Sequence, residues 1–272
     1  MFSVRATLME WLKSTRLFQA VRDRVRFQGE DPASYEDCFV EPVDATHVVV
    51  GSGPFLTRCV VLSDTHAELD VDSVPDGDIL FHCGDFCNWG SPIEEAEAFN
   101  ELMGRLPHKL KVVIAGNHET CFKGCSRAEI ARVLSNCTYL QDELLDLGGA
   151  TIYGTPWTHA RSFWYHGNAF SAPPDELERR FGAIPSCDIL MSHVPPLSIM
   201  DAAQGIHVGS VALRRNVLER VRPTVHLFGH NHDEAGMRRT EEVLFINAAQ
   251  KLHRQPMTFD LHTKDEIVIP SA

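Results

Sequence analysis

The sequence has little positive charge. Its 272 residues include 25 Lys and Arg against 37 Asp and Glu, which gives a formal net charge of −12. An acidic surface repels a polyphosphate backbone, so an extended nucleic-acid groove is not expected. The chain also lacks a strip of basic residues, which argues against a processive nuclease. A protein of this charge that handles phosphate needs bound cations to reverse the local field.

Cysteine motifs and membrane signals are missing as well. The eight Cys are spread over separate segments without a CxxC pair, so a Cys-based zinc site is not supported. The glycines of "GSG" at 51–53 have no GxGxxG continuation and are no nucleotide fingerprint. No signal-peptide core and no membrane-spanning apolar run occurs. We therefore expect a soluble, cytoplasmic protein with reduced cysteines.

The N-terminal region differs in character from the rest of the chain. The segment "RATLMEWLKSTRLFQAVRDRVR" places apolar residues at helical spacing on one face and Arg and Lys on the other. We expect this amphipathic helix to dock on the main domain, because apolar stripes usually face a core. Membrane contact or targeting through the helix is the less favoured alternative. The predicted division is an N-terminal extension over 1–57 and one domain over 58–272.

From residue 58 onward, short apolar runs of strand length alternate with helical patterns. The runs are nearly continuous in hydrophobicity, which suits strands covered on both faces. Helices are predicted over 91–106, 126–136 and 209–222, with Ser91 and Ser126 as N-caps. Alternating strands and helices indicate an α/β architecture. The predicted strands lie within "RCVVLSD", "DILFHCGD", "KLKVVIAGNH", "ATIYGTPW", "CDILMSH", "TVHLFGH" and "VLFINAA", with a further short strand at "THVVV".

Five of the strands end in residues that can bind metal. In an open α/β sheet, ligands bind beyond the carboxyl ends of the strands, so we expect these side chains to converge on one sheet edge. A Gly precedes three of them, and we expect it to allow the turn that aims the next side chain at the centre. The candidate residues are Asp64, His66, Asp85, Asn117, His118, His193, His230 and His232.

The number and type of these side chains favour two divalent ions. Imidazole together with carboxylate suits Zn, Mn or Fe. Asp85 is the candidate bridge, because one carboxylate has enough lone pairs for two cations. Two ions of this kind activate a water between them in hydrolytic sites. The predicted ligands are Asp64, His66 and His232 at the first ion and Asn117, His193 and His230 at the second.

These motifs, in this order, resemble those of the calcineurin-like metallophosphoesterase superfamily. The matching stretches are "SDTH", "GD" of "HCGD", "GNHE", "SH" before "VPP", and "GHNH", spread over roughly residues 58–262. The stretches "YGTPW", "CDILMSHVPPL" and "TVHLFGHNH" are similar to the brain-expressed metallophosphoesterase-domain-containing family, relatives of the class III cyclic nucleotide phosphodiesterases. The resemblance implies two mixed β-sheets packed as a sandwich flanked by α-helices, with a dinuclear metal centre.

The resemblance also implies the reaction. It indicates a phosphodiesterase acting on small, cyclic-nucleotide-like substrates through a hydroxide that bridges two metal ions, with Mn the expected metal in vitro. Asn117 and His118 are the predicted catalytic residues, and His118 is expected to protonate the leaving group. The stretch "GDFCNWG" lacks the Arg of the superfamily's protein phosphatases, which makes that class less favoured. A phosphomonoesterase, a nuclease, a dinucleotide hydrolase and a metal-binding scaffold without catalysis remain alternatives.

Other residues near these motifs have a structural explanation available. Glu119 is expected to orient its loop, and His82 is a possible outer partner of Asp85. Trp157, Phe163 and Trp164 either stack on a substrate base or pack over the core. The remaining His residues in the apolar runs and loops are expected to be packed or solvated: His47, His108, His207, His226, His253 and His262. The sequence does not predict an oligomeric state.

Overall fold

The structure is a computed structural model that describes residues 40–88, 92–160, 169–203, 206–250 and 255–269. The chain divides into two units, Met1–Cys38 and Phe39–Ala272, and the account below concerns the second. The amphipathic N-terminal helix predicted from the sequence lies outside the described residues. The predicted domain division at residue 57 stays a prediction. No helix of the described residues is both long enough and apolar enough to cross a membrane.

The first sheet contains the strands that carry the first three metal motifs. Its order is β2-β17-β3-β4-β5-β6, in which β3, β4, β5 and β6 run parallel and β17 runs antiparallel to β3. The strands are β2 (His47–Gly51), β3 (Phe55–Leu62), β4 (Ile79–His82), β5 (Leu110–Val113), β6 (Thr138–Tyr139) and β17 (Met257–Thr263).

The second sheet contains the strands that lead to the remaining motifs. Its order is β1-β15-β16-β14-β11-β8-β7, with a parallel centre made of β16, β14, β11 and β8 and an antiparallel strand on either side. The strands are β1 (Glu41–Val43), β7 (Glu143–Asp146), β8 (Thr151–Thr155), β11 (Ile189–Ser192), β14 (Val225–Phe228), β15 (Gly236–Arg239) and β16 (Leu244–Asn247). Both sheets are therefore mixed, as the sequence predicts.

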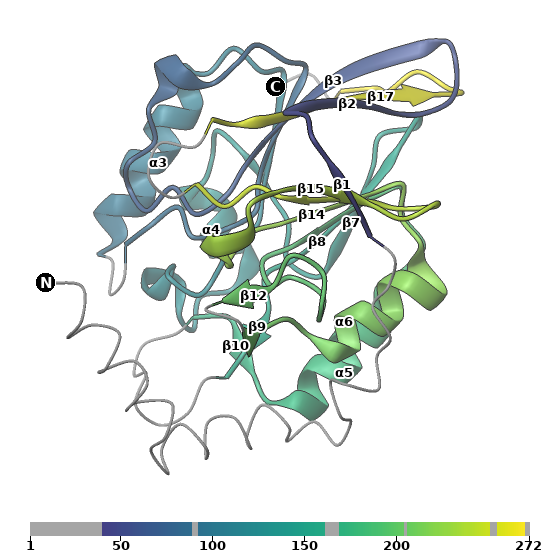
Figure 1. The fold of residues 1–272 in the computed structure, drawn as a ribbon. Coiled ribbons are helices and arrows are strands. Elements are labelled where there is room, and N and C mark those ends of the chain that lie inside the picture. The colour runs from purple at the N-terminus through teal and green to yellow at the C-terminus, as the bar shows by residue number, and fades with distance from the viewer. Residues whose placement is uncertain (1–39, 89–91, 161–168, 204–205, 251–254, 270–272) are drawn as a thin grey trace, which may run out of the picture. The chain divides into compact units, whose positions relative to one another are not determined.

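Helices connect strands within each sheet (Figure 1). Two small pairs stand apart from the sheets: β9 (Thr158–His159) with β10 (Ser171–Ala172), and β12 (Ala202–Ala203) with β13 (Ile206–His207). The α-helices are α3 (Ile93–Arg105), α4 (Arg127–Val133), α5 (Pro174–Gly182) and α6 (Val211–Asn216), and α6 continues as a π-helical turn, Val217–Val221. The 3-10 turns are Val71–Ser73, Thr120–Phe122 and His232–Glu234.

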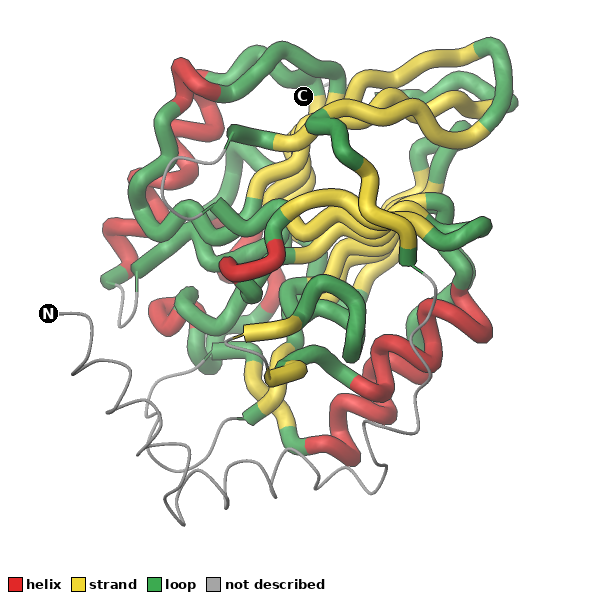
Figure 2. The backbone as a smooth tube through the Cα atoms, viewed as in Figure 1, coloured by secondary structure: helices red, strands yellow, loops and turns green. Residues whose placement is uncertain are grey.

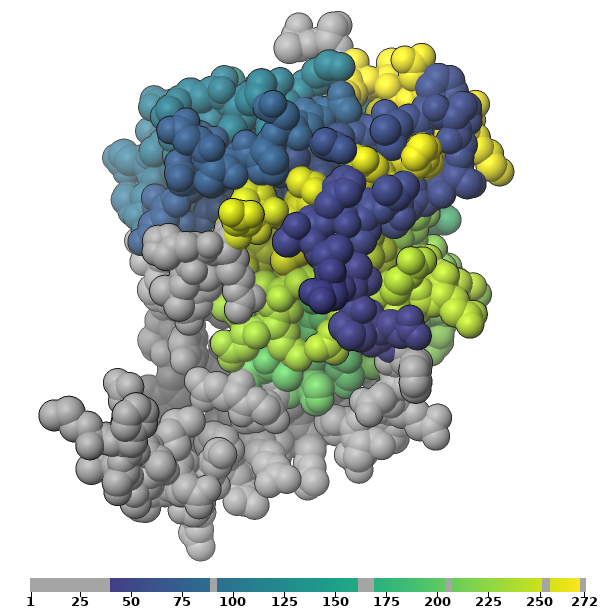
Figure 3. All heavy atoms as spheres, turned by 45° about the horizontal axis from the view of Figure 1, so that its top comes forward, coloured from purple at the N-terminus to yellow at the C-terminus, as the bar shows by residue number. Residues whose placement is uncertain are grey.

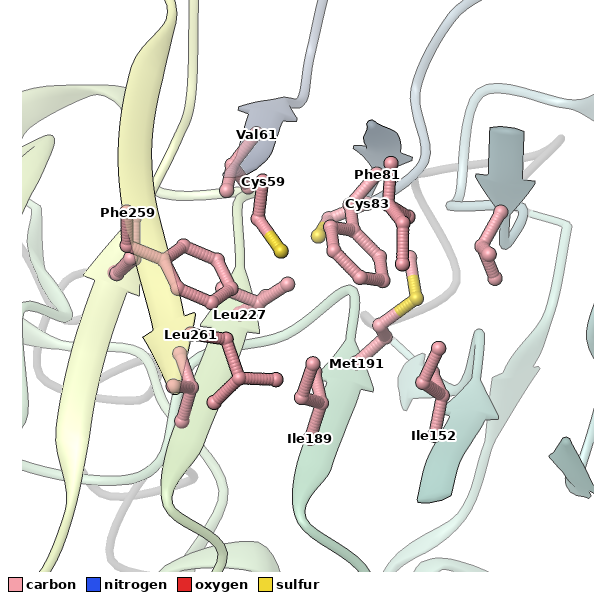
Figure 4. Close-up of a cluster of buried hydrophobic side chains, with 14 of the residues drawn as sticks. Cys59, Val61, Phe81, Cys83, Ile152, Ile189, Met191, Leu227, Phe259 and Leu261 are labelled. Carbon is pink, nitrogen blue, oxygen red and sulfur yellow. The ribbon is translucent and has the colours of Figure 1, made fainter. Parts of the chain in front are cut away.

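The two sheets pack face to face over a shared apolar core. Figure 4 shows side chains of the first sheet, such as Phe81 and Phe259, meeting Ile189, Met191 and Leu227 of the second. Each of these side chains is buried. Removing this much apolar surface from water is the main stabilising term of the fold. The sandwich therefore holds the ends of its parallel strands at fixed positions.

Helices cover the outer face of each sheet (Figure 2). Phe99 and Met103 of α3 pack with Val60 and Leu80 of the first sheet. Leu177 of α5 and α6 residues pack in the same way against the second sheet. The strands β4, β11, β14 and β16 are consequently buried along their whole length. The sequence predicts from their continuous hydrophobicity that these strands are covered on both faces, and this prediction is confirmed.

Local sequence signals account for the starts of α4 and α6. Ser126 and Glu129 form the predicted capping box at the start of α4. Ser210 caps α6 by accepting the N–H of Leu213. The first predicted helix begins later than expected, at Ile93, with Pro92 at the N-cap. Pro92 has no N–H to lose there and keeps an extended conformation, so it sits just outside the helix.

Strands from opposite ends of the described chain lie together. On the face shown in Figure 3, the purple segment after residue 40 lies beside the yellow segment that includes β17. β17 pairs with both β2 and β3, and β1 pairs with β15 of the second sheet. β1 and β2 both precede residue 57, so each sheet includes one strand from the predicted extension.

Candidate metal centre

The predicted ligands follow five parallel strands, but these strands belong to two sheets. Asp64, Asp85 and Asn117 come after β3, β4 and β5 of the first sheet, whereas His193 and the His230–His232 segment follow β11 and β14 of the second. The expectation of a single sheet edge is therefore wrong. Because the sheets are stacked, the carboxyl ends of both sets of strands meet at one end of the sandwich.

The backbone turns sharply at the ligand residues themselves. Asp64, His66, Asp85 and His230 all have positive φ values, between 45° and 67°. Non-glycine residues seldom adopt this left-handed conformation, and such residues cluster at functional sites. The sequence predicts that the glycine before each ligand makes the turn. Of the three glycines, only Gly84 has a positive φ, at +92°.

The other two glycines are needed for space. A Cβ on Gly116 would lie 2.4 Å from Oδ1 of Asp85, and one on Gly229 would lie 2.1 Å from Oδ2 of Asp64. These distances are shorter than any van der Waals contact. The side chains of Asp85 and Asp64 therefore occupy the volume that a larger residue would fill.

The first group of candidate ligand atoms comes from Asp64, His66 and His232, the side chains expected at the first ion. Nε2 of His232 lies 3.0 Å from Oδ1 of Asp64 and 3.4 Å from Nε2 of His66. The other oxygen of Asp64 accepts the hydroxyl of Ser63 at 2.6 Å and the backbone N–H of His230 at 2.9 Å. Asp64 is thereby locked with one oxygen facing the two imidazoles.

The second group comes from Asp85, His193 and His230, and the structure adds Asn117 to it. Nε2 of His193 lies 3.2 Å from Oδ2 of Asp85, 3.2 Å from Oδ1 of Asn117 and 3.2 Å from Nδ1 of His230. His230 thus faces the group with its Nδ1 nitrogen. The two groups bring together the side chains predicted for the two ions, and their role as ligands and the bridging role of Asp85 stay predictions.

The geometry of both groups suits a bound cation, because the atoms that face one another within each group are acceptors. His66 and His193 direct Nδ1 at the carbonyl oxygens of Cys87 and Cys83, at 3.2 and 2.8 Å. A neutral ring that donates from Nδ1 has a lone pair on Nε2, and that lone pair faces further acceptor atoms in each group. Ligand atoms about 2.1 Å from a common ion lie roughly 3.0–3.4 Å apart, which is the spacing observed.

The charges of the site also favour bound cations. Asp64 and Asp85 are buried carboxyl groups, and both act on His193. Burial lowers the pKa of His193, but the charge and hydrogen bond of Asp85 outweigh burial and raise this pKa to about 10. The pocket therefore attracts a proton onto His193. A divalent cation would supply the missing positive charge and displace that proton.

The carboxylates show the same balance. Burial alone would raise the pKa of Asp64, but its hydrogen bond with His232 and the charge of His193 hold this pKa well below the usual range. The pKa of Asp85 is likewise lowered, since the charge and hydrogen bond of His193 outweigh burial. Both carboxylates thus stay ionised and able to bind a cation.

The Glu119 carboxyl holds two loops of the first sheet together by hydrogen bonds to their backbone. Its carboxyl oxygens accept the backbone N–H groups of Asp85 at 3.0 Å, Cys87 at 2.9 Å and Gly116. Burial and the nearby charge of Asp85 raise the pKa of Glu119 to about 8. Because one side chain joins the Asp85 loop to the Asn117 loop, the prediction that Glu119 orients its loop is confirmed.

His118 stands beside the two groups without belonging to either. Its backbone N–H donates to Oδ1 of Asp85 at 2.8 Å, and its Nε2 lies 3.8 Å from Oδ2 of the same carboxylate. The ring meets His66 edge-on, with centroids 4.6 Å apart. Its side chain is 22% exposed, so one edge of the ring reaches solvent next to the predicted ions.

The family model of the calcineurin-like phosphoesterases matches residues 57–234 of this sequence. The chain belongs to the calcineurin-like phosphoesterase family. This membership, together with two groups of ligand atoms, makes it a metal-dependent phosphoesterase with two candidate metal sites.

Similar proteins place the chain in the predicted branch of the family. Metallophosphoesterase domain-containing protein 1 of Homo sapiens is 34% identical over 249 residues, which cover 82% of this chain and 75% of that protein. A UPF0046 protein of Caenorhabditis elegans is 38% identical over 231 residues, covering 75% and 80%. The solved structure of TT1561 of Thermus thermophilus has a TM-score of 0.50 at 13% identity and covers 72% of this chain and 91% of that one, a likeness of fold.

Several residues singled out from the sequence have structural partners. The indole N–H of Trp157 donates to Asp142 at 2.7 Å, and the guanidinium of Arg180 lies 3.6 Å from the ring centroid. One face of the indole is thus already covered, which favours the packing alternative for Trp157. Phe163 and Trp164 lie outside the described residues.

The predicted outer partner His82 is bonded to a neighbouring hydroxyl instead. Its Nε2 lies 3.0 Å from the hydroxyl of Thr65, which stands between Asp64 and His66. His82 therefore supports the first ligand loop.

The carbonyl groups of Cys83 and Cys87 accept hydrogen bonds from candidate ligand histidines and orient them. The sequence does not predict these contacts, because a backbone carbonyl leaves no signal in the residue type.

Proposed function

We propose that the chain is a dinuclear phosphodiesterase that hydrolyses small phosphodiesters such as cyclic nucleotides. The observation that carries this proposal is the pair of ligand groups, with Asp85 beside His193 in one of them and His118 next to both. Bound at these groups, two divalent cations would offset the charge of the phosphoryl group and make a water acidic enough to react at neutral pH. Mn is the metal we expect to support activity in vitro.

The side chains around the predicted ions have separate tasks in this proposal. Asp64, His66 and His232 would hold one cation, Asn117, His193 and His230 would hold the other, and Asp85 would contribute to both. The NH₂ of the Asn117 side-chain amide is a donor that suits a phosphoryl oxygen, because Oδ1 faces His193. Such fixed donors stabilise charge that develops in the transition state.

His118 is proposed to deliver the proton to the leaving oxygen. A sugar alkoxide is a poor leaving group, so its departure depends on a proton donor in place. The hydrogen bond from the His118 backbone to Asp85 fixes the start of the side chain, and the ring edge with Nε2 faces the same carboxylate. The donor is therefore anchored to Asp85, the residue proposed to bridge the two cations.

Two arguments support a diester substrate. The sequences of the motifs resemble those of relatives of the class III cyclic nucleotide phosphodiesterases. The stretch after Asp85 lacks the Arg that the protein phosphatases have in this motif. Fold and metal ligands alone do not determine the substrate, so a phosphomonoesterase, a nuclease or a dinucleotide hydrolase on the same scaffold remains the alternative.

The deciding experiment measures metal content and substrate range together. The full chain is loaded with Mn and assayed on 3′,5′- and 2′,3′-cyclic nucleotides, bis(4-nitrophenyl) phosphate and 4-nitrophenyl phosphate. We expect two metal equivalents per chain and a kcat/KM that is higher on the diesters. Hydrolysis of the monoester alone would contradict the diesterase, and no hydrolysis at full metal occupancy would favour a non-catalytic scaffold.

A further inference from the structure

Asp201 and His207 form a carboxylate–imidazole pair outside the two ligand groups. Asp201 is wholly buried, and its Oδ1 lies 2.6 Å from Nδ1 of His207. Its Oδ2 accepts the N–H of Gly209 at 2.8 Å, so both carboxylate oxygens are engaged. The His207 side chain is 45% exposed. The sequence predicts an ordinary histidine here, and the buried carboxylate behind it emerges only in the fold.

The pair belongs to the segment that leaves the metal centre after His193. Ser210 donates its N–H to the carbonyl of Pro195 at 2.9 Å, and Leu197 donates to the carbonyl of Ser210 at 3.1 Å. The far end of the segment is thereby bound back next to its start. His207 lies three residues before this closure, so it stands near the loop that carries His193.

A second set of bonds joins the pair to the other histidine loop. Ala202, opposite His207 in the β12–β13 pairing, donates its N–H to Oε2 of Glu234 at 2.6 Å. Its carbonyl accepts the side-chain amide of Asn231 at 3.2 Å, and Asn231 is the residue between His230 and His232. The strand pair that carries His207 is thus hydrogen-bonded to the ligand loops of both β11 and β14.

The hydrogen bond to Asp201 decides which face His207 presents. A buried carboxylate needs a donor, and Nδ1–H of the imidazole supplies it. In the neutral ring, the proton on Nδ1 leaves a lone pair on Nε2, at the opposite edge. The partly exposed imidazole therefore offers an acceptor to solvent or to a bound molecule.

We propose that His207 binds substrate by accepting a hydrogen bond, at Nε2, from a hydroxyl or N–H group on the organic part of the phosphoester, and that Asp201 is its positioning residue. This inference rests on the proposed function. A two-metal centre recognises the phosphoryl group, which all phosphoesters share, so discrimination between substrates must come from side chains around it.

The test compares two diesters that release the same 4-nitrophenolate. Thymidine 5′-(4-nitrophenyl phosphate) has hydroxyl and N–H donors, whereas bis(4-nitrophenyl) phosphate has none. In the Mn-loaded full chain, His207→Ala should raise KM for the thymidine ester about twofold to tenfold, the effect of one hydrogen bond, and leave kinetics on the aryl diester unchanged. His207→Gln keeps an acceptor and should restore part of the difference. His262→Ala, on β17, is the matched control.

Asp201→Asn separates positioning from structure. The amide can still accept the Gly209 N–H, but its NH₂ group would donate to Nδ1 and move the ring proton to Nε2. The thymidine preference should then fall although His207 is present, with an unchanged melting temperature. Equal losses on both diesters, or a preference that survives His207→Ala, would show that the pair only maintains the loop.

The two proposals fail in different ways. A parental chain that hydrolyses neither diester but does hydrolyse monoesters contradicts the diesterase. The same variants are then compared on adenosine 5′-monophosphate and 4-nitrophenyl phosphate by phosphate release. If His207→Ala raises KM for adenosine 5′-monophosphate and not for 4-nitrophenyl phosphate, the role of His207 in substrate binding is supported. Equal effects on the two monoesters would overturn that role.

Discussion

The two sheets support the candidate metal centre by different means. The first contributes Asp64, Asp85 and Asn117, and the buried carboxyl of Glu119 joins the loops of Asp85 and Asn117. The second contributes histidines, and the long segment 194–210 connects their loops. Charge is therefore concentrated on one sheet, and most of the imidazole nitrogens come from the other.

The two sheets also share one device. His82 on β4 and His226 on β14 are wholly buried, and burial lowers the pKa of each to about 3. Each ring bonds a hydroxyl next to a ligand, that of Thr65 at 3.0 Å and that of Ser192 at 2.8 Å. The comparison indicates that the ligand loops need rigid, uncharged support from within each sheet, whatever ligands they carry.

The largest effect is expected from the residue that serves both sheets. Asp85→Ala should reduce activity by more than about a thousandfold and lower metal content at both sites, because this carboxylate faces His193 of the second sheet and is the predicted bridge. Elemental analysis and turnover measure this. His66→Ala is the comparison, since His66 belongs to the first group alone and its loss should affect only that site. Retention of one full metal equivalent in Asp85→Ala would contradict the bridge.

A smaller loss is expected where a residue acts on substrate rather than on metal. His118→Ala should keep both metals and lower turnover by roughly a hundredfold, the usual contribution of one proton donor. The loss should be smaller for nitrophenyl esters, whose leaving group needs no proton. Metal content and a series of esters with different leaving groups check this. Equal losses across the series would remove the proton-donor role.

The second sheet can be tested alone at His230. Its φ of +67° suits glycine, and its backbone N–H to Asp64 would remain, so His230→Gly removes the imidazole with little strain. Metal affinity at the second site should fall by about tenfold or more, with stoichiometry approaching one and partial recovery of activity at high Mn. Tight binding of two metals at the parental rate would show that His230 is no ligand.

The smallest effect concerns the buried histidines and acid stability. The pKa of His226 is about 3 in the folded protein against an ordinary 6.5, so the unfolded chain binds more protons between these values. The free energy of unfolding should therefore decrease as pH falls below about 6.5, with a contribution of roughly 1.4 kcal/mol per pH unit from this group.

His226→Gln keeps a hydrogen-bonding side chain and removes the titration. In urea unfolding of the metal-free protein, the loss between pH 6.5 and pH 5.5 should be about 1 kcal/mol smaller in the variant than in the parent. His262→Gln on β17 is the control and should behave as the parent does. Equal acid sensitivity of His226→Gln and the parent would contradict this account.

Much of this protein follows from its sequence. The buried strands are recognisable because a run such as "ILM" at 189–191 is entirely apolar, and Ser126 with Glu129 predicts a helix start. The ligands are recognisable because metal-binding side chains follow directly after such runs. These signals are local: a strand, a cap and a strand end are each determined by residues within a few positions of one another.

Only the tertiary structure decided how the ligands meet. β17 brings residues near the end of the chain between β2 and β3, and its alternating sequence "MTFDLHT" gives a weaker signal than the fully buried strands. The stacking of two sheets, rather than one edge, places His193 against Asp85 and Asn117. The need for glycine at 116 and 229 comes from neighbours distant in the chain, Asp85 and Asp64. The contact between Asp201 and His207 depends on how the backbone folds between them. Residue type records what a side chain can do, whereas its partners are decided by packing between segments far apart in sequence.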